Sequence, residues 1–370
     1  MIRRRLRRHL TRAAAFVAVA AAAASGCALP SLAPFGSNRR STRIISYNVQ
    51  NLFDDRLDGG EYDEYRPGAG WDRGRYYARL ERIDRVVRGV SAGRPPDILV
   101  LQEIESARVA HDLANDVLRR YRHVSAGASG RTTTQVVVLS RDRPASMRAH
   151  RVSFVEHVPA GERRRDPPPD PGPGFRVVRR GRDLLELSFP DRSLHILAAH
   201  WKSQSGGEAT TEPMRIAEAR LAQAVVASRD VAEGTASLLI GDLNEDLYEG
   251  RQHGYAYETA LVERGGAVTL VDSPPQRSGS GGDRWFRSLW GDDSGRGTYW
   301  YRGEWERLDH AFLRAGPRWR GSLRAVVLPE IVSDAGTPLR YDPRTGRGYS
   351  DHLPILVDLE RLAGAEPLAR

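Results

Sequence analysis

The sequence predicts a mixed α/β sandwich, and two observations lead to this prediction. Short apolar runs bounded by polar residues recur along the chain with the length of buried strands, and three longer segments space their apolar residues as a helix does. Helices alternate with strands in the first half of the chain, whereas strands follow one another directly in the second half. That order favours mixed sheets over a purely parallel sheet.

Each expected strand is an apolar run that stops at a polar residue. In chain order, the expected strands are Arg43–Tyr47, Asp97–Leu101, Gln135–Leu139, Asp183–Phe189, Ser193–Ala199, Ser237–Ile240, Arg307–Leu313 and Leu353–Leu359. The expected helices are Tyr76–Val90, Val109–Tyr121 and Pro213–Ser228. In the first helix, the residues that share one face at helical spacing are Tyr77, Leu80, Ile83, Val87 and Val90.

Two segments rich in glycine and charged or polar residues, Pro159–Gly174 and Ser278–Gly297, are predicted to be surface loops inserted within one domain, because strand-like segments flank each of them. The alternative is that each is a linker between domains. Neither contains enough apolar residues to form a core element. The second segment carries Trp285, Phe286 and Trp290. We interpret these aromatic residues as loop packing, with stacking on nucleobases as the alternative.

The first 27 residues have the pattern of an export signal. A basic head precedes the apolar run Ala13–Ala24, which is too short to span a bilayer as a helix. The sequence Ala-Ser-Gly-Cys that ends at Cys27 resembles the lipobox of bacterial lipoproteins, which implies cleavage before Cys27 and lipid attachment to it. The alternative is an ordinary signal peptide followed by a chance cysteine. We therefore expect an exported protein, either lipid-anchored in the cell envelope on a periplasmic or outer-membrane face, or secreted.

One large domain accounts for most of the chain. We expect a signal peptide over residues 1–27, a linker over 28–40, the domain over 41–362 and a tail over 363–370. Cys27 is the only cysteine, so a lipidated chain can hold no disulfide and its fold depends on core burial. We expect a monomer.

The net charge of the processed chain is small. The formal charge of +9 includes six arginines in the leader, so about +3 remains after cleavage. This balance gives little support to strong non-specific binding of nucleic acid. Lys202 is the only lysine, and lysine is not equivalent to arginine at a phosphate.

Polar residues with catalytic chemistry stand at or near the ends of six expected strands. These residues are Asn48 and Asn51, Gln102-Glu103, His200 to Ser203, Asp242 to Asn244, Asp309-His310 and Asp351-His352. A buried carboxylate costs several kcal/mol unless it is paired or binds a metal, so we expect the six ends to converge on one polar pocket. Alternation along an extended strand predicts that His200 shares a face with Lys202, and Asp242 with Asn244.

Six stretches together resemble the endonuclease/exonuclease/phosphatase superfamily. They are, in the order of that superfamily, "ISYNVQNLFDD", "LVLQEIES", "AAHWKS", "IGDLNED", "ERLDHAFL" and "YSDHLPI". The resemblance implies a four-layer sandwich, in which two mixed sheets pack face to face with helices on the outer faces. It also implies a metal-dependent phosphoesterase. The stretches "NVQNLFDD", "HWKSQSGG" and "GTYWYRGEWERLDH" are most similar to bacterial secreted nucleases or nuclease-like members.

The resemblance implies a metal site and a catalytic histidine. The residues expected to hold the ion, Mg²⁺ or Mn²⁺, are Glu103, Asn48, Asp351 and Asp242, with Glu103 as the first choice. Such hard cations prefer one or two carboxylates and keep several waters. His352 is expected to act as general base or proton relay, oriented by Asp309.

The remaining residues are expected to handle the water and the phosphate. Asp242 and Asn244 would position both, while His200 would bind the phosphate or protonate the leaving group. Asn48 is expected to contact a phosphate oxygen, and Lys202 to supply a positive charge. Structural roles are expected for two neighbours of these residues, Asn51 and His310.

We therefore expect a secreted, lipid-anchored, divalent-metal-dependent phosphodiesterase, with nucleic acid as the preferred substrate. The first alternative is a phospholipid phosphodiesterase of the sphingomyelinase type, or a phosphomonoesterase. A long exposed apolar hairpin would favour the lipid alternative, and none is evident in the sequence. The second alternative is a catalytically inactive surface lipoprotein that binds a partner, against which the full set of polar positions argues.

Overall fold

The computed structural model describes residues 40–91, 93–127, 134–158, 175–228, 234–247, 259–264, 267–270, 286–291 and 296–363. The predicted signal peptide with Cys27, the linker before Arg40 and the tail from residue 364 lie outside these residues. The predicted loop Pro159–Gly174 and Trp285 also lie outside them. Among the described residues, no helix combines the length and the apolar character that crossing a membrane requires.

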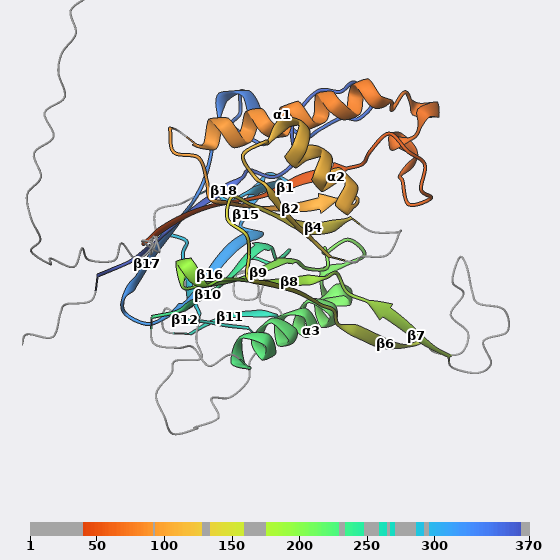
Figure 1. Cartoon of the computed structure of the whole chain (residues 1–370). Helices are drawn as coiled ribbons and strands as arrows, with labels where there is room; N and C mark the ends of the chain where they lie inside the picture. Colours follow the sequence, from red (N-terminus) through yellow and green to blue (C-terminus); the bar gives the residue numbers. More distant parts are fainter. Residues whose placement is uncertain are drawn as a thin grey trace, which may run out of the picture. The chain divides into compact units, whose positions relative to one another are not determined.

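A six-stranded mixed sheet is built from both ends of the described domain (Figure 1). Its order is β17 (Trp319–Ala325), β18 (Ile355–Arg361), β1 (Ser41–Leu52), β2 (Ile98–Ile104), β4 (Gln135–Ser140) and β3 (His123–Ala126). Strand β1 pairs in parallel with β2 and antiparallel with β18. The first and last of these strands in sequence, β1 and β18, are therefore neighbours in the sheet.

A second six-stranded sheet comes from the middle of the chain. Its order is β13 (Arg287–Ser288), β16 (Asp309–Ala315), β10 (Ala236–Asp242), β9 (Leu194–His200), β8 (Leu184–Phe189) and β5 (Ser146–His150). Three further strand pairs are β6 (Ser153–Val158) with β7 (Phe175–Arg180), β11 (Leu261–Arg264) with β12 (Ala267–Leu270), and β14 (Tyr299–Tyr301) with β15 (Glu304–Glu306).

Helices cover the outer face of each sheet (Figure 1). The α-helices are α1 (Arg73–Ser91), α2 (Ala107–Asp112) and α3 (Glu208–Ala227). Short helical turns are η1 (Asp63–Tyr65), η2 (Pro67–Ala69), the π-turn η3 (Leu113–Val117), η4 (Pro190–Arg192) and η5 (Pro329–Ile331).

Alternation along the strands sorts the core into three apolar layers. In β1, Ile44 packs between the two sheets, whereas Ile45 packs beneath α1 and α2. In β10, Leu238 packs between the sheets and Leu239 packs against α3. The architecture is thus helix, sheet, sheet, helix, and the predicted four-layer α/β sandwich is confirmed.

The structure contains all eight expected strands, and it adds strands that the sequence patterns did not indicate. Strand β17 was missed because Arg320, Gly321, Ser322 and Arg324 interrupt its apolar residues, and because it lies at the edge of the sheet, where charged residues are common. The expected helix Val109–Tyr121 was wrong in extent. Ser106 caps α2 at its start by accepting the N–H of Val109, and after Asp112 the chain makes one π-turn. Helix α3 begins at Glu208 instead of Pro213.

The segment Ser278–Gly297 contributes more to the core than we expected. Arg287–Ser288 forms the edge strand β13, and Phe286 is buried against the α3 side of the second sheet. Trp290 packs against the core between the sheets, and its indole Nε1 donates to the carbonyl of Asp309 at 3.2 Å. The packing interpretation is therefore confirmed for Phe286 and Trp290, and the expectation that this segment forms no core element was wrong.

Candidate active site

At one end of the strands, polar residues occupy the positions that face the space between the two sheets. The side chains that pack between the sheets occupy alternate positions, and the next inward positions are polar. These positions are Asn48 in β1, Gln102 in β2, His200 in β9, Asp242 in β10 and Asp309 in β16. All five are buried, so the strand alternation itself delivers their side chains to one enclosed place.

Strand register aligns three of these residues across the second sheet. Asp242 pairs with His200 in the parallel ladder and with Asp309 in the antiparallel ladder. The Nε2 atom of His200 lies 3.5 Å from Oδ2 of Asp242. His200, Asp242 and Asp309 are therefore neighbours in one row, although they are far apart in sequence.

His352 joins this row from the first sheet, just before β18 begins. Its Nδ1 lies 2.8 Å from Oδ2 of Asp309, and its Nε2 lies 3.9 Å from Oδ2 of Asp242. Ser350 fixes the backbone there, since its hydroxyl donates to the carbonyl of Asn48 at 2.7 Å and accepts the N–H of His352 at 3.1 Å. The imidazole is thus held between two carboxylates.

A β-bulge brings Glu103 into the site. Strict alternation in β2 would turn Glu103 to the helix-covered face, together with Leu101. Instead, the β1–β2 register shifts between Asn48 and Leu52, and Glu103 adopts a φ of 64°. Bulges re-aim side chains in this way. As a result, Glu103 Oε1 accepts the amide of Asn48 at 3.1 Å, and Oε2 accepts the N–H of Asn51 at 2.7 Å.

The amide of Asn48 links the two sheets. Its Nδ2 donates to Glu103 Oε1 and also to Asp242 Oδ2, the latter at 2.8 Å. Its Oδ1 accepts the N–H of Gln50 at 2.9 Å, which fixes the orientation of the amide. Two carboxylates from different sheets consequently converge on one side chain.

Asn244 and Lys202 lie beyond the strand ends, so the alternation argument does not apply to them. Asn244 has a φ of 53°; its N–H donates to Asp242 Oδ1 at 3.0 Å, and its Nδ2 donates to the carbonyl of Trp201 at 3.2 Å. The Nζ of Lys202 donates to the carbonyl of Ser203 at 2.8 Å. Asn244 therefore orients Asp242, while the ammonium group of Lys202 is bound within its own loop.

Asp351 is held at the edge of the site. Its N–H donates to Gln50 Oε1 at 3.1 Å, and its carboxylate lies 3.9 Å from the guanidinium of the exposed Arg340. Its expected role in the outer shell of a metal stays a prediction. His310, in contrast, points away from the site and its Nε2 bonds to the carbonyl of Glu245 at 2.9 Å, in line with the structural role that we expected.

Burial and neighbouring charges set the protonation of the three central groups. Burial raises the pKa of Asp242 to about 7, with the nearby Asp309 carboxylate adding to the effect. Burial lowers the pKa of His200 well below its usual value, so His200 is neutral. Burial also disfavours the cation of His352, but Asp309 and Asp242 outweigh it and raise its pKa to about 10. The charges around His352 thus favour an imidazolium that donates hydrogen bonds.

A family comparison identifies the class of protein. A sequence profile described as "Endonuclease/Exonuclease/phosphatase family" matches residues 45–352. The chain belongs to this family. Its members are phosphoesterase hydrolases, so the predicted phosphoesterase class is confirmed. Family members typically use divalent metal ions. No curated protein sequence matches the chain significantly.

Several solved structures are similar to this family member at low identity. TDP2 from D. rerio, complexed with a single-strand DNA product, has 16% identity and a TM-score of 0.45, covering 86% of this chain and 99% of its own. Beta toxin from Staphylococcus aureus has 12% identity and a TM-score of 0.48, with coverages of 85% and 99%. ANGEL2, a 2',3'-cyclic phosphatase, has 15% identity and a TM-score of 0.47, with coverages of 88% and 97%. Similarity at this level identifies neither substrate nor partner.

The oxygen donors of this phosphoesterase fit a hard divalent ion. Glu103 and Asp242 supply carboxylates that converge on Asn48, and Mg²⁺ typically takes one or two carboxylates while keeping its waters. Within the described ranges, no cluster of three or more acidic, histidine or cysteine side chains could hold a metal by itself.

Sequence reasoning missed several residues that position the site of this phosphoesterase. Ser350 and Gln50 hold the backbone around His352 and Asp351, and Tyr299 packs its ring 4.9 Å from the ring of His352. Ser350 stands directly beside Asp351-His352, which was a usable signal. Tyr299 carried no such signal, because its contact with His352 depends on tertiary pairing alone.

Proposed function

We propose that the protein is a divalent-metal-dependent phosphodiesterase that hydrolyses nucleic-acid phosphodiester bonds. The observation that supports this most is the position of Asp242, whose Oδ2 accepts the Asn48 amide at 2.8 Å and lies 3.9 Å from the imidazole of His352. Glu103 Oε1 accepts a hydrogen bond from the same Asn48 amide. Carboxylates and a carboxylate-bound imidazole in one buried cluster are the groups that water attack on a phosphate requires.

Asp242 is the group best situated to orient the attacking water. Hydrogen bonds from Asn48 and from the N–H of Asn244 fix its two oxygens. A carboxylate held in this way can align a water molecule and accept its proton. The charged His352 can donate its Nε2 proton to the leaving oxygen, and the neutral imidazole can then take up the proton held by Asp242. In this way His352 would act as the proton relay expected from the sequence.

His352 and His200 stabilise charge on the phosphoryl oxygens. With Nδ1 bonded to Asp309, His352 presents Nε2–H as a donor toward the same space as Asp242. Two flanking carboxylates favour the charged imidazolium, and a charged donor is the stronger one. His200 is buried and offers a neutral N–H donor beside Asp242.

A divalent ion would be held by Glu103 and Asp242, with Asn48 between them. When bound, such an ion supplies Lewis-acid neutralisation of phosphoryl charge and makes bound water more acidic. Asp351 and Lys202 complete the proposed set, as an outer carboxylate and as a cation near the phosphate. Mg²⁺ or Mn²⁺ suits this donor chemistry.

Nucleic acid is the substrate class that the surroundings of the site favour over phospholipid. The hairpin β14–β15 next to His352 is short, and its turn is Arg302-Gly303 rather than an aliphatic tip. Its exposed side chains are aromatic or charged, whereas anchoring in the bilayer core requires apolar length. The described residues therefore support the preference that we inferred from the sequence.

We also propose that the protein is exported and anchored through a lipid on Cys27, and that it is a monomer. The lipobox-like sequence supports anchorage, and several acyl chains together hold a protein stably at a membrane. An enzyme held in this way would act on extracytoplasmic substrate.

One experiment tests the catalytic proposal. The purified protein is incubated with Mg²⁺ or Mn²⁺ on plasmid DNA, RNA, sphingomyelin vesicles and bis(p-nitrophenyl) phosphate in parallel, with an EDTA arm for each substrate. We expect metal-dependent hydrolysis of the bis-ester and of at least one nucleic acid, at a rate well above that on sphingomyelin. Preferential hydrolysis of sphingomyelin would refute the substrate class, and undiminished activity in EDTA would refute the metal dependence.

A further inference from the structure

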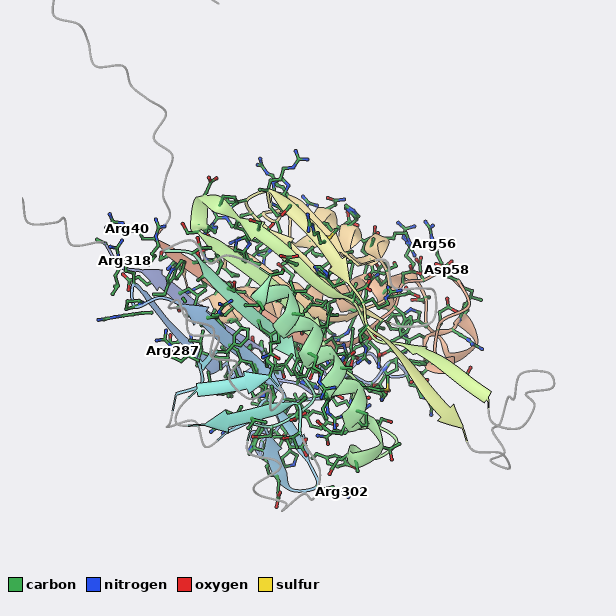
Figure 2. The ribbon with its side chains drawn as sticks, turned by 90° about the horizontal axis from the view of Figure 1, so that it is seen from below. Arg40, Arg56, Asp58, Arg287, Arg302 and Arg318 are labelled. Atoms are coloured by element: carbon green, nitrogen blue, oxygen red, sulfur yellow. The ribbon has the colours of Figure 1, made fainter. Side chains whose placement is uncertain are left out.

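The hairpin β14–β15 presents a row of aromatic rings that begins at the catalytic histidine. Its strands pair Tyr299 with Glu306 and Tyr301 with Glu304 across the same face. Arg302 and Gly303 form the turn with φ values of 48° and 93°, as a tight two-residue hairpin turn requires. Figure 2 shows Arg302 at the lower margin of the view.

The rings on this face follow one another at stacking distances. The ring of Tyr299 lies 4.9 Å from the ring of His352, measured between centroids. The ring of Tyr301 lies 6.2 Å from that of Tyr299 with an interplanar angle of 25°, and the guanidinium of Arg302 lies 5.0 Å from the Tyr301 centroid. Tyr301 is 47% exposed, so the outer end of the row is open to a ligand.

The opposite face of the hairpin anchors it to the domain. Trp300 pairs with Trp305 and their rings meet edge to face at 5.2 Å. Trp305 packs against the core beneath α1, and the guanidinium of Arg296 lies 5.2 Å from its ring. Trp300 on this face is 37% exposed and Tyr301 on the tyrosine face is 47% exposed, so the tyrosine face carries the more exposed ring.

Backbone pairing ties the hairpin to His352. Tyr299 and His352 form an antiparallel bridge, and the N–H of Leu353 donates to the carbonyl of Thr298 at 2.7 Å. A ligand stacked on Tyr301 would therefore be held at a fixed offset from the imidazole. That is the geometry of a subsite for the group next to the scissile phosphate.

We infer that the face formed by Tyr299 and Tyr301 is a stacking platform for an unpaired nucleobase adjacent to the scissile phosphate. This inference rests on the proposed function and deepens it, because it makes single-stranded nucleic acid the preferred substrate. Aromatic side chains stack on bases of any sequence, provided that the base is not paired. Arg302 lies beside the platform at the exposed turn, with its guanidinium 5.0 Å from the Tyr301 centroid, where it can contact the phosphate of a stacked nucleotide.

Two carboxylates beside the platform can take part in binding a base. Glu304 and Glu306 lie opposite the two tyrosines on the same face. Carboxylates there can accept hydrogen bonds from the exocyclic amino groups of bases.

The test compares Tyr301→Ala with Tyr301→Phe, which keeps the aromatic ring and removes only the hydroxyl group. The substrates are a short single-stranded oligonucleotide and an otherwise identical oligonucleotide built of abasic residues. We expect Tyr301→Ala to lower kcat/KM on the normal oligonucleotide by about tenfold or more, because one base–aromatic stack is lost. Tyr301→Phe should stay within about twofold of wild type.

The abasic oligonucleotide isolates the stacking contribution, since it keeps the phosphates and removes the bases. The wild-type protein should cleave it more slowly than the normal strand, and the effect of Tyr301→Ala should disappear on it. An unchanged kcat/KM for Tyr301→Ala on the normal strand, or an equal loss on both strands, would overturn the inference. A selective loss of sphingomyelin-vesicle hydrolysis would overturn it in favour of a lipid surface.

Failure of the proposed function has a different signature. If the wild-type protein hydrolyses bis(p-nitrophenyl) phosphate but neither oligonucleotide, the nuclease proposal itself is wrong and the platform is wrong with it. Thermal unfolding of each variant shows whether the hairpin still folds.

Discussion

The Nδ1 atom of His352 lies 2.8 Å from Oδ2 of Asp309, in a pair that joins the two sheets of the sandwich. Asp309 is completely buried, and its second oxygen has no hydrogen-bond partner within the described part of the chain. The carboxylate therefore has one clear task, which is to orient the imidazole and favour its charged form.

Replacing Asp309 with Asn should cost most of the activity without unfolding the protein. The amide keeps the shape but removes the charge that stabilises the imidazolium, so kcat should fall by about a hundredfold or more with little change in KM. Hydrolysis of bis(p-nitrophenyl) phosphate measures this. Asp63→Asn is the matched control, because that side chain is 92% exposed. Wild-type kcat in Asp309→Asn would contradict the assigned role.

Replacing Glu103 with Gln should weaken divalent-ion binding. The change removes one of the two carboxylates that converge on Asn48 and retains the hydrogen-bonding shape. Calorimetric titration with Mn²⁺ should show at least about tenfold weaker binding, and activity should recover only at higher metal concentration. The exposed Glu81→Gln on α1 is the control. Equal metal affinity in the two variants would rule Glu103 out as a ligand.

Gly241 should tolerate no side chain. Its φ is 146°, and a Cβ at this position would overlap the carbonyl oxygen of Ala199 on the neighbouring strand. An alanine here would have both a strained backbone and a steric overlap, so Gly241→Ala should lower the free energy of unfolding by about 3 kcal/mol or more. Gly241 also directly precedes Asp242 in the site. Gly316→Ala, where a Cβ meets open space, should change it by less than about 0.5 kcal/mol. Urea unfolding of both variants distinguishes the two sites.

Glu218 should make stability depend on pH. It is buried on α3, where its Oε2 accepts the N–H of Lys202 at 2.8 Å, and burial raises its pKa to about 7. Between the usual carboxyl pKa of 4.5 and about 7, the folded state holds a proton that the unfolded state releases. This group therefore costs stability as pH rises through that window, and the cost is complete above pH 7.

Glu218→Gln removes this cost. We compare the free energy of unfolding of the variant with that of the wild type at each pH. This difference should favour the variant by up to about 3 kcal/mol more at pH 8 than at pH 4. Urea unfolding at the two pH values measures the difference. The exposed Glu360→Gln should show no such gain, and a Glu218→Gln variant that behaves like it would contradict the prediction.

Replacing Cys27 with Ser should release the protein from membranes. The lipid would have no thiol to attach to, and the rest of the leader would still direct export. Fractionation of cells that express each form should move the protein from the membrane pellet to the soluble fraction. Retention in the pellet would refute the lipid anchor.

Much of this site could be predicted from the sequence, because strand alternation is a local property. The runs that end in Asn48, His200 and Asp242 were recognisable as buried strands, and their period of two determines which side chains face inward. Alternation did not predict the direction of side chains beyond the end of a strand or at a β-bulge. Lys202 lies past the end of β9, and Glu103 sits at a bulge that no apolar pattern signals.

The sequence by itself determined the strands, the inward rows and the chemical character of the groups at their ends, since these depend on side chains a few residues apart. The tertiary structure decided which groups meet. The pairing of Asp309 with His352, the turning of Glu103 toward Asn48, and the contact of Tyr299 with the catalytic imidazole all depend on long-range strand register. Register follows from the burial of whole faces at once, so only the assembled sheets specify it.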